Sequence, residues 1–133
     1  MRLLLDTHVW LWAATQPENL GKKTRAVLVD PKTDRLVSAA SVLEIARLNE
    51  SGQVVLSTPA ARWIDESSKI LILNHLPITT DIALEAYLLP APFHRDPADR
   101  LLVATARIHN LVLVTADERI LQYAPVRSTD CRR

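Results

Sequence analysis

The sequence contains only two glycines and one cysteine among its 133 residues. Two glycines are too few for the glycine-rich loops that cradle phosphates in P-loop and dinucleotide-binding proteins, and neither motif occurs. The single cysteine, Cys131, has no partner for an internal disulfide, which suits a reducing compartment. The scarcity of these residues argues against both kinds of nucleotide-binding protein and against a fold held by disulfides.

Long apolar runs and a charge of one sign are also missing. No stretch approaches the ~18 apolar residues of a membrane-spanning helix, and the opening M-R-L-L-L-D is too short for a signal peptide. With 16 basic and 15 acidic residues the net charge is +1, so no overall field attracts nucleic acid. We therefore expect a soluble, cytoplasmic protein that forms one domain over residues 1–133.

Short apolar runs alternate with helical patterns along the chain. The expected strands are Leu3–Leu5, Leu36–Ser38, His75–Ile78 and Leu111–Val114. The expected helices cover about 8–16, 20–29, 42–49, 59–70, 81–88 and 98–109, with a short one ending at Leu121. This alternation predicts a parallel α/β sheet with helices on its faces. The last residues, 127–133, are interpreted as a frayed end.

Four acidic residues lie at or near points where an apolar run gives way to a helical pattern: Asp6, Glu44, Asp99 and Asp117. In a parallel α/β sheet such junctions converge on one edge. Two carboxylates about 4 Å apart repel by roughly 4 kcal/mol at an effective dielectric constant near 20, so the cluster favours a bound cation. Oxygen ligands favour Mg²⁺ or Mn²⁺ over zinc. Metal-dependent phosphodiester hydrolysis is the leading hypothesis.

Each acidic residue also has a purely structural interpretation. Asp6 and Asp117 are suited to the positive ends of the helices that follow them. Ser41 and Glu44 match a capping box, in which the two side chains bond to each other's backbone N–H groups. In the segment D-P-A-D-R at 96–100, the order Asp96, Pro97, Asp99 is a strong helix start. Capping explains each residue singly but does not require the four to meet.

Polar residues beside the acids are candidates for supporting or substrate contacts. Thr7 and Thr115 have hydroxyls that would orient water or phosphate, or make ordinary turn hydrogen bonds. Arg100 would contact phosphates of the substrate or pair with Asp96 and Asp99 in the free protein. The histidines next to these motifs, His8 and His94, are further candidates for contact with the phosphate, against simple packing or exposure.

Four stretches resemble the PIN-domain ribonucleases, most closely the VapC toxins of bacterial toxin–antitoxin pairs. They are L-L-L-D-T-H-V-W-L-W at 3–12, S-A-A-S-V-L-E-I at 38–45, H-R-D-P-A-D-R-L-L-V-A-T-A at 94–106 and L-V-T-A-D at 113–117. The resemblance implies a PIN-like α/β/α sandwich with a central, mainly parallel sheet. It also implies one or two Mg²⁺ or Mn²⁺ ions held by carboxylates.

By position in the motifs, the resemblance assigns the acidic residues different roles. Asp6 and Asp99 correspond to the principal metal ligands, Glu44 to an acid that binds metal or holds water, and Asp117 to a more variable fourth acid. Asp96 receives a supporting or capping role. All four main acids are thus candidates for both catalysis and metal binding.

The resemblance implies an endoribonuclease toxin that is commonly a homodimer and is neutralised by a cognate antitoxin protein. It implies contact with DNA only through that antitoxin, and no membrane. One alternative is a catalytically inert module of the same fold, whose acidic edge binds a basic partner segment. Another is an aspartyl phosphatase or phosphoacceptor domain, against which the residue two beyond Asp6 is His8 rather than a second aspartate.

Overall fold

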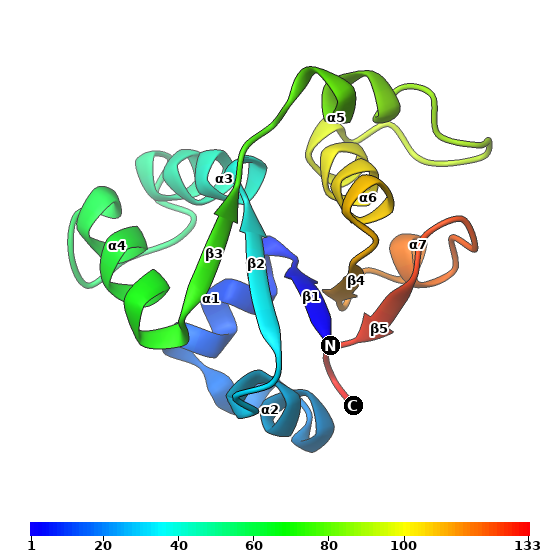
Figure 1. Cartoon of the computed structure of the whole chain (residues 1–133). Helices are drawn as coiled ribbons and strands as arrows, with labels where there is room; N and C mark the ends of the chain where they lie inside the picture. Colours follow the sequence, from blue (N-terminus) through cyan, green and yellow to red (C-terminus); the bar gives the residue numbers. More distant parts are fainter.

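A five-stranded parallel sheet forms the centre of the molecule in the computed structural model, which describes residues 1–133 (Figure 1). The strands are β1 (Arg2–Leu5), β2 (Asp34–Ser38), β3 (Leu73–Leu76), β4 (Val112–Thr115) and β5 (Ser128–Asp130). Their order is β3-β2-β1-β4-β5, and every pairing is parallel. The predicted α/β fold with a parallel sheet is confirmed, and the order reverses between β1 and β4.

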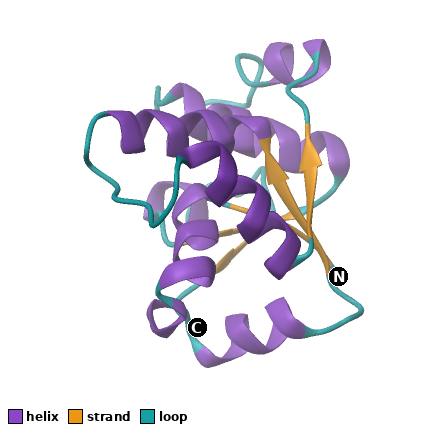
Figure 2. Cartoon of the chain, turned by 90° about the vertical axis from the view of Figure 1, so that its left-hand side faces the viewer, coloured by secondary structure: helices purple, strands orange, loops and turns teal.

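Seven α-helices connect and cover the strands: α1 (Thr7–Thr15), α2 (Lys22–Val29), α3 (Ala39–Glu50), α4 (Ala60–Leu71), α5 (Thr80–Glu85), α6 (Pro97–His109) and α7 (Glu118–Leu121). A short 3₁₀ helix, η1 (Pro17–Asn19), lies between α1 and α2. Figure 2 shows the helices packed around the strands when the molecule is turned by 90°. None of the helices combines the length and apolar character that crossing a bilayer requires.

Alternate residues of β1 face opposite cores, as the two-residue period of a strand dictates. Leu3 and Leu5 pack with Trp10 of α1 and Ile45 of α3, whereas Leu4 packs with Leu102 of α6. A strand buried on both faces needs the continuous apolar run that β1 has. The sheet is therefore fixed between two helical layers, and polar residues at the ends of its strands are positioned by a rigid core.

The C-terminal segment is ordered, so the prediction of a frayed end is wrong. Residues Ser128–Asp130 form β5 against β4, and Cys131 is fully buried. The carbonyl of Arg133 accepts a hydrogen bond from the N–H of Thr24 at 3.1 Å. Three polar residues give no apolar pattern to recognise, because this strand depends on pairing along an edge rather than on its own side chains.

Helix α3 begins earlier than predicted, which overturns the capping box. Its N-cap is Ser38, whose hydroxyl accepts a hydrogen bond from the N–H of Ala40 at 3.0 Å. Ser41 is therefore inside the helix, and Glu44 lies in the second turn. Smaller boundary differences affect α2, which begins at Lys22, and β3, which ends at Leu76.

Candidate active site at the carboxyl edge of the sheet

Asp6 follows β1 and is held by two hydrogen bonds. The Thr7 N–H donates to Oδ1 at 2.7 Å, which confirms Asp6 as the N-cap of α1. The Thr115 hydroxyl donates to Oδ2, also at 2.7 Å. Only 5% of Asp6 is exposed. Asp6 can therefore cap α1 and also lie at the carboxyl edge of the sheet.

The two threonines beside the acids connect elements of the site. The Thr115 hydroxyl, which donates to Asp6, also accepts the N–H of Asp117 at 3.0 Å. The Thr7 hydroxyl donates to Oγ of Ser41 at 2.9 Å and so joins α1 to α3. Both hydroxyls are engaged inside the protein, in keeping with the structural interpretation of these residues.

Asp99 is brought to Asp6 and Asp117 by the first turn of α6. The N-cap of this helix is Asp96, whose Oδ1 accepts the N–H groups of Ala98 at 2.9 Å and Asp99 at 3.4 Å, so the predicted helix start is confirmed. Burial, followed by the negative charges of Asp6, Asp96 and Asp117, raises the pKa of Asp99 to about 7. The cluster thus contains a carboxyl group whose charge the protein compensates poorly.

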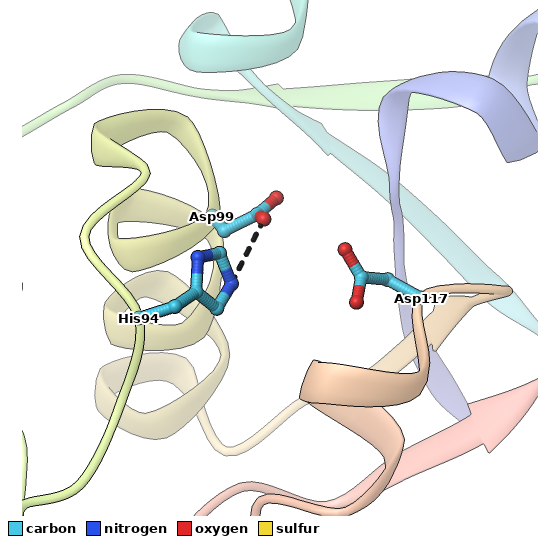
Figure 3. A group of neighbouring side chains, drawn as sticks. All are labelled: His94, Asp99 and Asp117. Atoms are coloured by element: carbon cyan, nitrogen blue, oxygen red, sulfur yellow. Dashed lines mark ion pairs between the residues drawn. The ribbon is translucent and has the colours of Figure 1, made fainter.

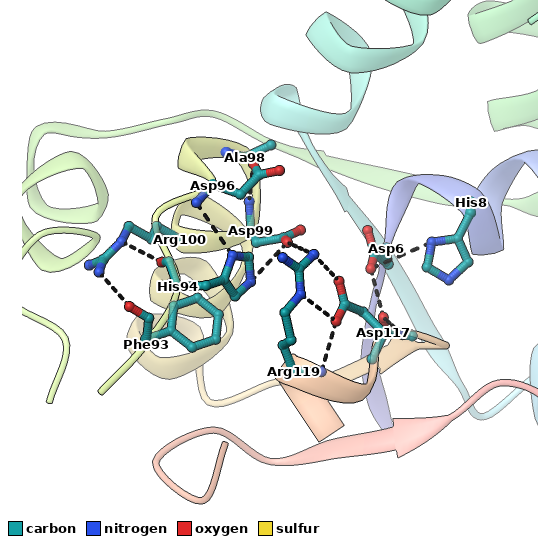
Figure 4. A network of polar contacts seen from close by, with 11 residues as sticks. Asp6, His8, Phe93, His94, Asp96, Ala98, Asp99, Arg100, Asp117 and Arg119 are labelled. Carbon is teal, nitrogen blue, oxygen red and sulfur yellow. Dashed lines mark hydrogen bonds and ion pairs between the residues drawn. The ribbon is translucent and has the colours of Figure 1, made fainter. Parts of the chain in front are cut away.

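Asp117 caps α7 and is paired with Arg119, a residue that the sequence analysis missed. Arg119 donates to Asp117 from Nε to Oδ1 at 3.2 Å and from Nη2 to Oδ2 at 2.9 Å. These bonds hold the pKa of Asp117 below its usual value. Nη2 also lies 3.7 Å from Oδ2 of Asp99, so one guanidinium contacts both acids (Figure 4).

His94 points into the same cluster from the loop before α6. Its Nε2 lies 3.1 Å from Oδ2 of Asp99 but without hydrogen-bonding alignment, which leaves a buried nitrogen with no hydrogen-bond partner. Ligand atoms of His94, Asp99 and Asp117 all lie within 4.8 Å of one another (Figure 3). Burial, and then the charge of Arg119, lowers the pKa of His94. A neutral imidazole and two carboxylates form a donor set that fits a divalent cation.

His8 lies beside Asp6 but has a different role. Its Nε2 accepts the N–H of Ala116 at 2.9 Å, and its Nδ1 faces Oδ2 of Asp6 at 3.6 Å. The acceptor role of Nε2 places the proton of the neutral ring on Nδ1, toward the carboxylate. His8 therefore links α1 to the end of β4.

Glu44 is separated from the other three predicted acids. It lines a groove of about 400 Å³ between α3 and α6, together with Arg47, Asp96, Pro97 and Leu101. Neither Glu44 nor Asp6 belongs to the group formed by His94, Asp99 and Asp117. Asp6 is nevertheless connected to it, because the Thr115 hydroxyl bonds to both Asp6 and Asp117 and the charge of Asp6 raises the pKa of Asp99. The structure thus gathers Asp6, Asp99 and Asp117 and places Glu44 in an adjoining groove.

Arg100 contacts three backbone carbonyls rather than an acid. Its guanidinium donates to Ala86 at 3.0 Å, Phe93 at 3.0 Å and His94 at 2.9 Å. The expected pairing with Asp96 or Asp99 is therefore wrong. Arg100 therefore supports the loop from which His94 projects and does not contact the clustered acids.

Comparison with known proteins places these motifs in a family. The family model of the PIN domain matches residues 3–125. Ribonuclease VapC22 of Mycobacterium tuberculosis is 34% identical over 118 residues, which cover 89% of this chain and 88% of that protein.

Solved structures share the fold at lower identity. VapBC2 of Rickettsia felis, bound to a DNA fragment from its promoter, has a TM-score of 0.71 at 14% identity and 98% coverage of both chains. DNA-bound VapBC of Salmonella typhimurium has a TM-score of 0.70 at 18% identity, again with 98% coverage of both chains.

Proposed function

The chain belongs to the PIN-domain family, and on that premise we propose that it is a divalent-metal-dependent endoribonuclease that hydrolyses phosphodiester bonds of RNA. One observation carries the proposal: Asp6, Asp99 and Asp117, far apart in sequence, converge around a carboxyl group whose pKa is raised to about 7. Although Arg119 is paired with Asp117, the negative charge of Asp99 is compensated incompletely, which makes the cluster suited to a cation. The ribonuclease name of the 34% identical relative supports RNA as the substrate.

Asp99 and Asp117 would hold the ion, with Asp6 beside them and His94 as a nitrogen ligand. Mainly oxygen ligands favour Mg²⁺ or Mn²⁺. Such an ion, when bound, lowers the pKa of a coordinated water and polarises a phosphoryl oxygen. Glu44, in the adjoining groove, would position water or substrate rather than bind the ion directly.

The other residues prepare the carboxylates for this task. Thr115 and Thr7 fix both oxygens of Asp6, so little reorganisation is needed when a ligand arrives. Asp99 must lose its proton before it can coordinate, and a pKa near 7 lets this occur at neutral pH. Arg100 holds the loop of His94 in place through three carbonyls.

We further propose that the chain is the toxin of a toxin–antitoxin pair and is neutralised by a cognate antitoxin. The solved structures of similar fold described above are VapBC proteins bound to DNA. An apolar groove of about 170 Å³, lined by Ala13, Leu20, Leu28 and Leu71, adds a surface suited to an amphipathic segment of such a partner. Co-expression with the antitoxin should relieve growth arrest caused by this chain, and an Asp99→Asn variant should cause no arrest.

Calorimetric titration of metal-stripped protein with Mn²⁺ tests the site without knowledge of the RNA. The parent should bind Mn²⁺, and the Asp6→Asn/Asp99→Asn double variant should remain folded and bind none. Asp81→Asn is the matched control, because this exposed acid in the first turn of α5 lies outside the cluster. In the presence of Mn²⁺, the parent and Asp81→Asn should cleave RNA and the double variant should not.

Two results would count against the proposal. Equal Mn²⁺ binding by the parent and the double variant would remove the metal from this cluster. A parent that neither binds Mn²⁺ nor cleaves RNA would favour the inert module whose acidic edge binds a basic partner.

A further inference from the structure

Arg119 occupies the space between Asp99 and Asp117. Its Nη2 lies 2.9 Å from Oδ2 of Asp117 and 3.7 Å from Oδ2 of Asp99, and its Nε donates to Oδ1 of Asp117 at 3.2 Å. In Figure 4 the guanidinium reaches from the start of α7 to both carboxylates. A positive group therefore already lies at the position that a cation shared by these two acids would take.

We propose that Arg119 is an internal counter-ion that a divalent metal displaces, and that the displaced guanidinium then binds a phosphate of the RNA. The inference rests on the proposed function of the site. It gives Arg119 two alternative positions, one on the carboxylates and one on the substrate, and so couples metal binding to substrate binding.

Displacement follows from the contacts of Asp117. Both oxygens of this carboxylate are engaged by the Arg119 side chain, so a metal that takes Asp117 as a ligand would share the carboxylate with the guanidinium. Two positive groups also repel each other at such short range.

The Arg119 side chain is free to leave. It is 60% exposed and comes from a helix of four residues. The backbone N–H of Arg119 donates separately to Oδ1 of Asp117 at 2.8 Å, so the cap of α7 persists when the side chain rotates.

Binding to phosphate follows from the chemistry and position of the guanidinium. Its planar set of N–H donors matches phosphate oxygens in a bidentate manner. Arg119 is the one arginine or lysine that contacts Asp99 or Asp117. Arg100, another arginine near the site, is held by three carbonyls, and Arg95 makes no contact with either acid. A phosphate that approaches the acidic cluster thus meets Arg119 as its available cationic partner.

The chain provides a matched control in Arg132. It lies two residues after Asp130, as Arg119 lies two residues after Asp117, and donates from Nε and Nη2 to the two Asp130 oxygens at 2.8 Å each. Arg132 also pairs with Glu118 at 2.7 Å but makes no contact with Asp99. Arg132→Gln therefore removes the same charge from the same local geometry outside the cluster.

Mn²⁺ calorimetry and RNA cleavage kinetics, applied to the parent, Arg119→Gln and Arg132→Gln, test the inference. Arg119→Gln should bind Mn²⁺ about tenfold more tightly and raise the KM for RNA about tenfold, two effects of opposite sign on ligand binding. Arg132→Gln should change neither by a comparable factor. In ¹⁵N NMR spectra, Mg²⁺ should shift the Arg119 Nε–H resonance, which Arg119→Lys identifies by its loss.

Each contrary result overturns a defined part of the inference. If Arg132→Gln tightened Mn²⁺ binding as much as Arg119→Gln does, the gain in affinity would come from the loss of a positive charge anywhere nearby and not from the contacts of Arg119. Unchanged Mn²⁺ affinity in Arg119→Gln would show that the guanidinium does not compete with metal, and an unchanged KM would remove the phosphate contact. If Arg119→Gln has no effect but Asp99→Asn abolishes Mn²⁺ binding, the inference about Arg119 fails and the proposed function survives. If the parent itself binds no Mn²⁺, the inference and the proposed function both fail.

Discussion

Thr115 donates its hydroxyl to Oδ2 of Asp6 over 2.7 Å, although the two residues are 109 positions apart in the chain. The hydroxyl oxygen of Thr115 also accepts the N–H of Asp117 at 3.0 Å. One buried hydroxyl thus sets the mutual position of two of the three clustered acids. It does so at the ends of β1 and β4, where the strand order reverses and α/β proteins commonly bind ligands.

Thr115→Val should destabilise the protein by about 1–3 kcal/mol, because the change preserves shape but leaves the Asp117 N–H and an oxygen of Asp6 without this partner. Urea denaturation measures the loss. Mn²⁺ affinity should fall as well, since Asp6 loses its orientation.

Thr105→Val is the control for this substitution. Thr105 is equally buried, but its hydroxyl bonds only to the Leu101 carbonyl within α6. It should leave Mn²⁺ affinity unchanged. An equal loss of Mn²⁺ affinity in both variants would show that the Thr115 hydroxyl has no specific role in the site.

The raised pKa of Asp99 predicts a pH-dependent stability. Between about pH 4 and pH 7 the folded state keeps a proton on Asp99 that the unfolded state releases, so stability falls as pH rises through this window. Between pH 5 and pH 8, Asp99 should contribute a loss on the order of 1–3 kcal/mol in urea denaturation of the parent, partly offset by His94, whose lowered pKa gives a gain in stability as pH rises. Asp99→Asn should largely remove this loss, whereas a full loss in the variant would exclude Asp99 as its source.

Metal binding should show the opposite dependence on pH. A cation can bind the carboxylate of Asp99 only after its proton leaves, so Mn²⁺ affinity should rise from pH 6 to pH 8 and level off above the pKa of about 7. Calorimetry in two buffers of different ionisation enthalpy would detect proton release on binding at pH 6. No proton release would mean that Asp99 is already ionised before the metal arrives.

Arg100→Gln should loosen the loop that carries His94. The carbonyls of Ala86, Phe93 and His94 would lose their donor, at a cost of about 1–3 kcal/mol. Hydrogen exchange should accelerate within residues 86–96. Arg95→Gln is the control, because Arg95 is exposed and forms no ion pair; faster exchange in that variant would indicate a charge effect instead.

The sequence predicted those features whose signals are local. The apolar run of β1 and the order Asp96, Pro97, Asp99 at the start of α6 depend on neighbours in the chain, and both appear in the structure as expected. The convergence of Asp6 and Asp117 followed from topology, because a parallel sheet gathers the carboxyl ends of its strands at one edge. Asp99 follows no strand and reaches this edge from the first turn of α6.

Features that depend on distant partners were not predictable in the same way. Ser41 resembles a helix cap in the sequence, yet α3 begins three residues earlier, because Ser38 already takes the cap at the end of β2. Arg119 has no local signal beyond its spacing from Asp117, and its contact with Asp99 exists only after α6 and α7 pack together. The expected pairing of Arg100 with Asp96 or Asp99 failed for the same reason, since its partners belong to the segment before α6.

Gly21→Ala tests whether the C-terminal segment is an integral part of the fold. A Cβ added to Gly21 would lie 1.9 Å from the Arg133 carbonyl oxygen, so the backbone must separate there. The hydrogen bonds from Gly21 N–H to Cys131 and from Thr24 N–H to Arg133 would be weakened, with a loss of about 1–3 kcal/mol. Gly52→Ala, at a φ of 79° in open space, adds backbone strain without a clash. Hydrogen exchange in β5 should accelerate in Gly21→Ala alone; unchanged exchange there would show that β5 does not depend on this contact.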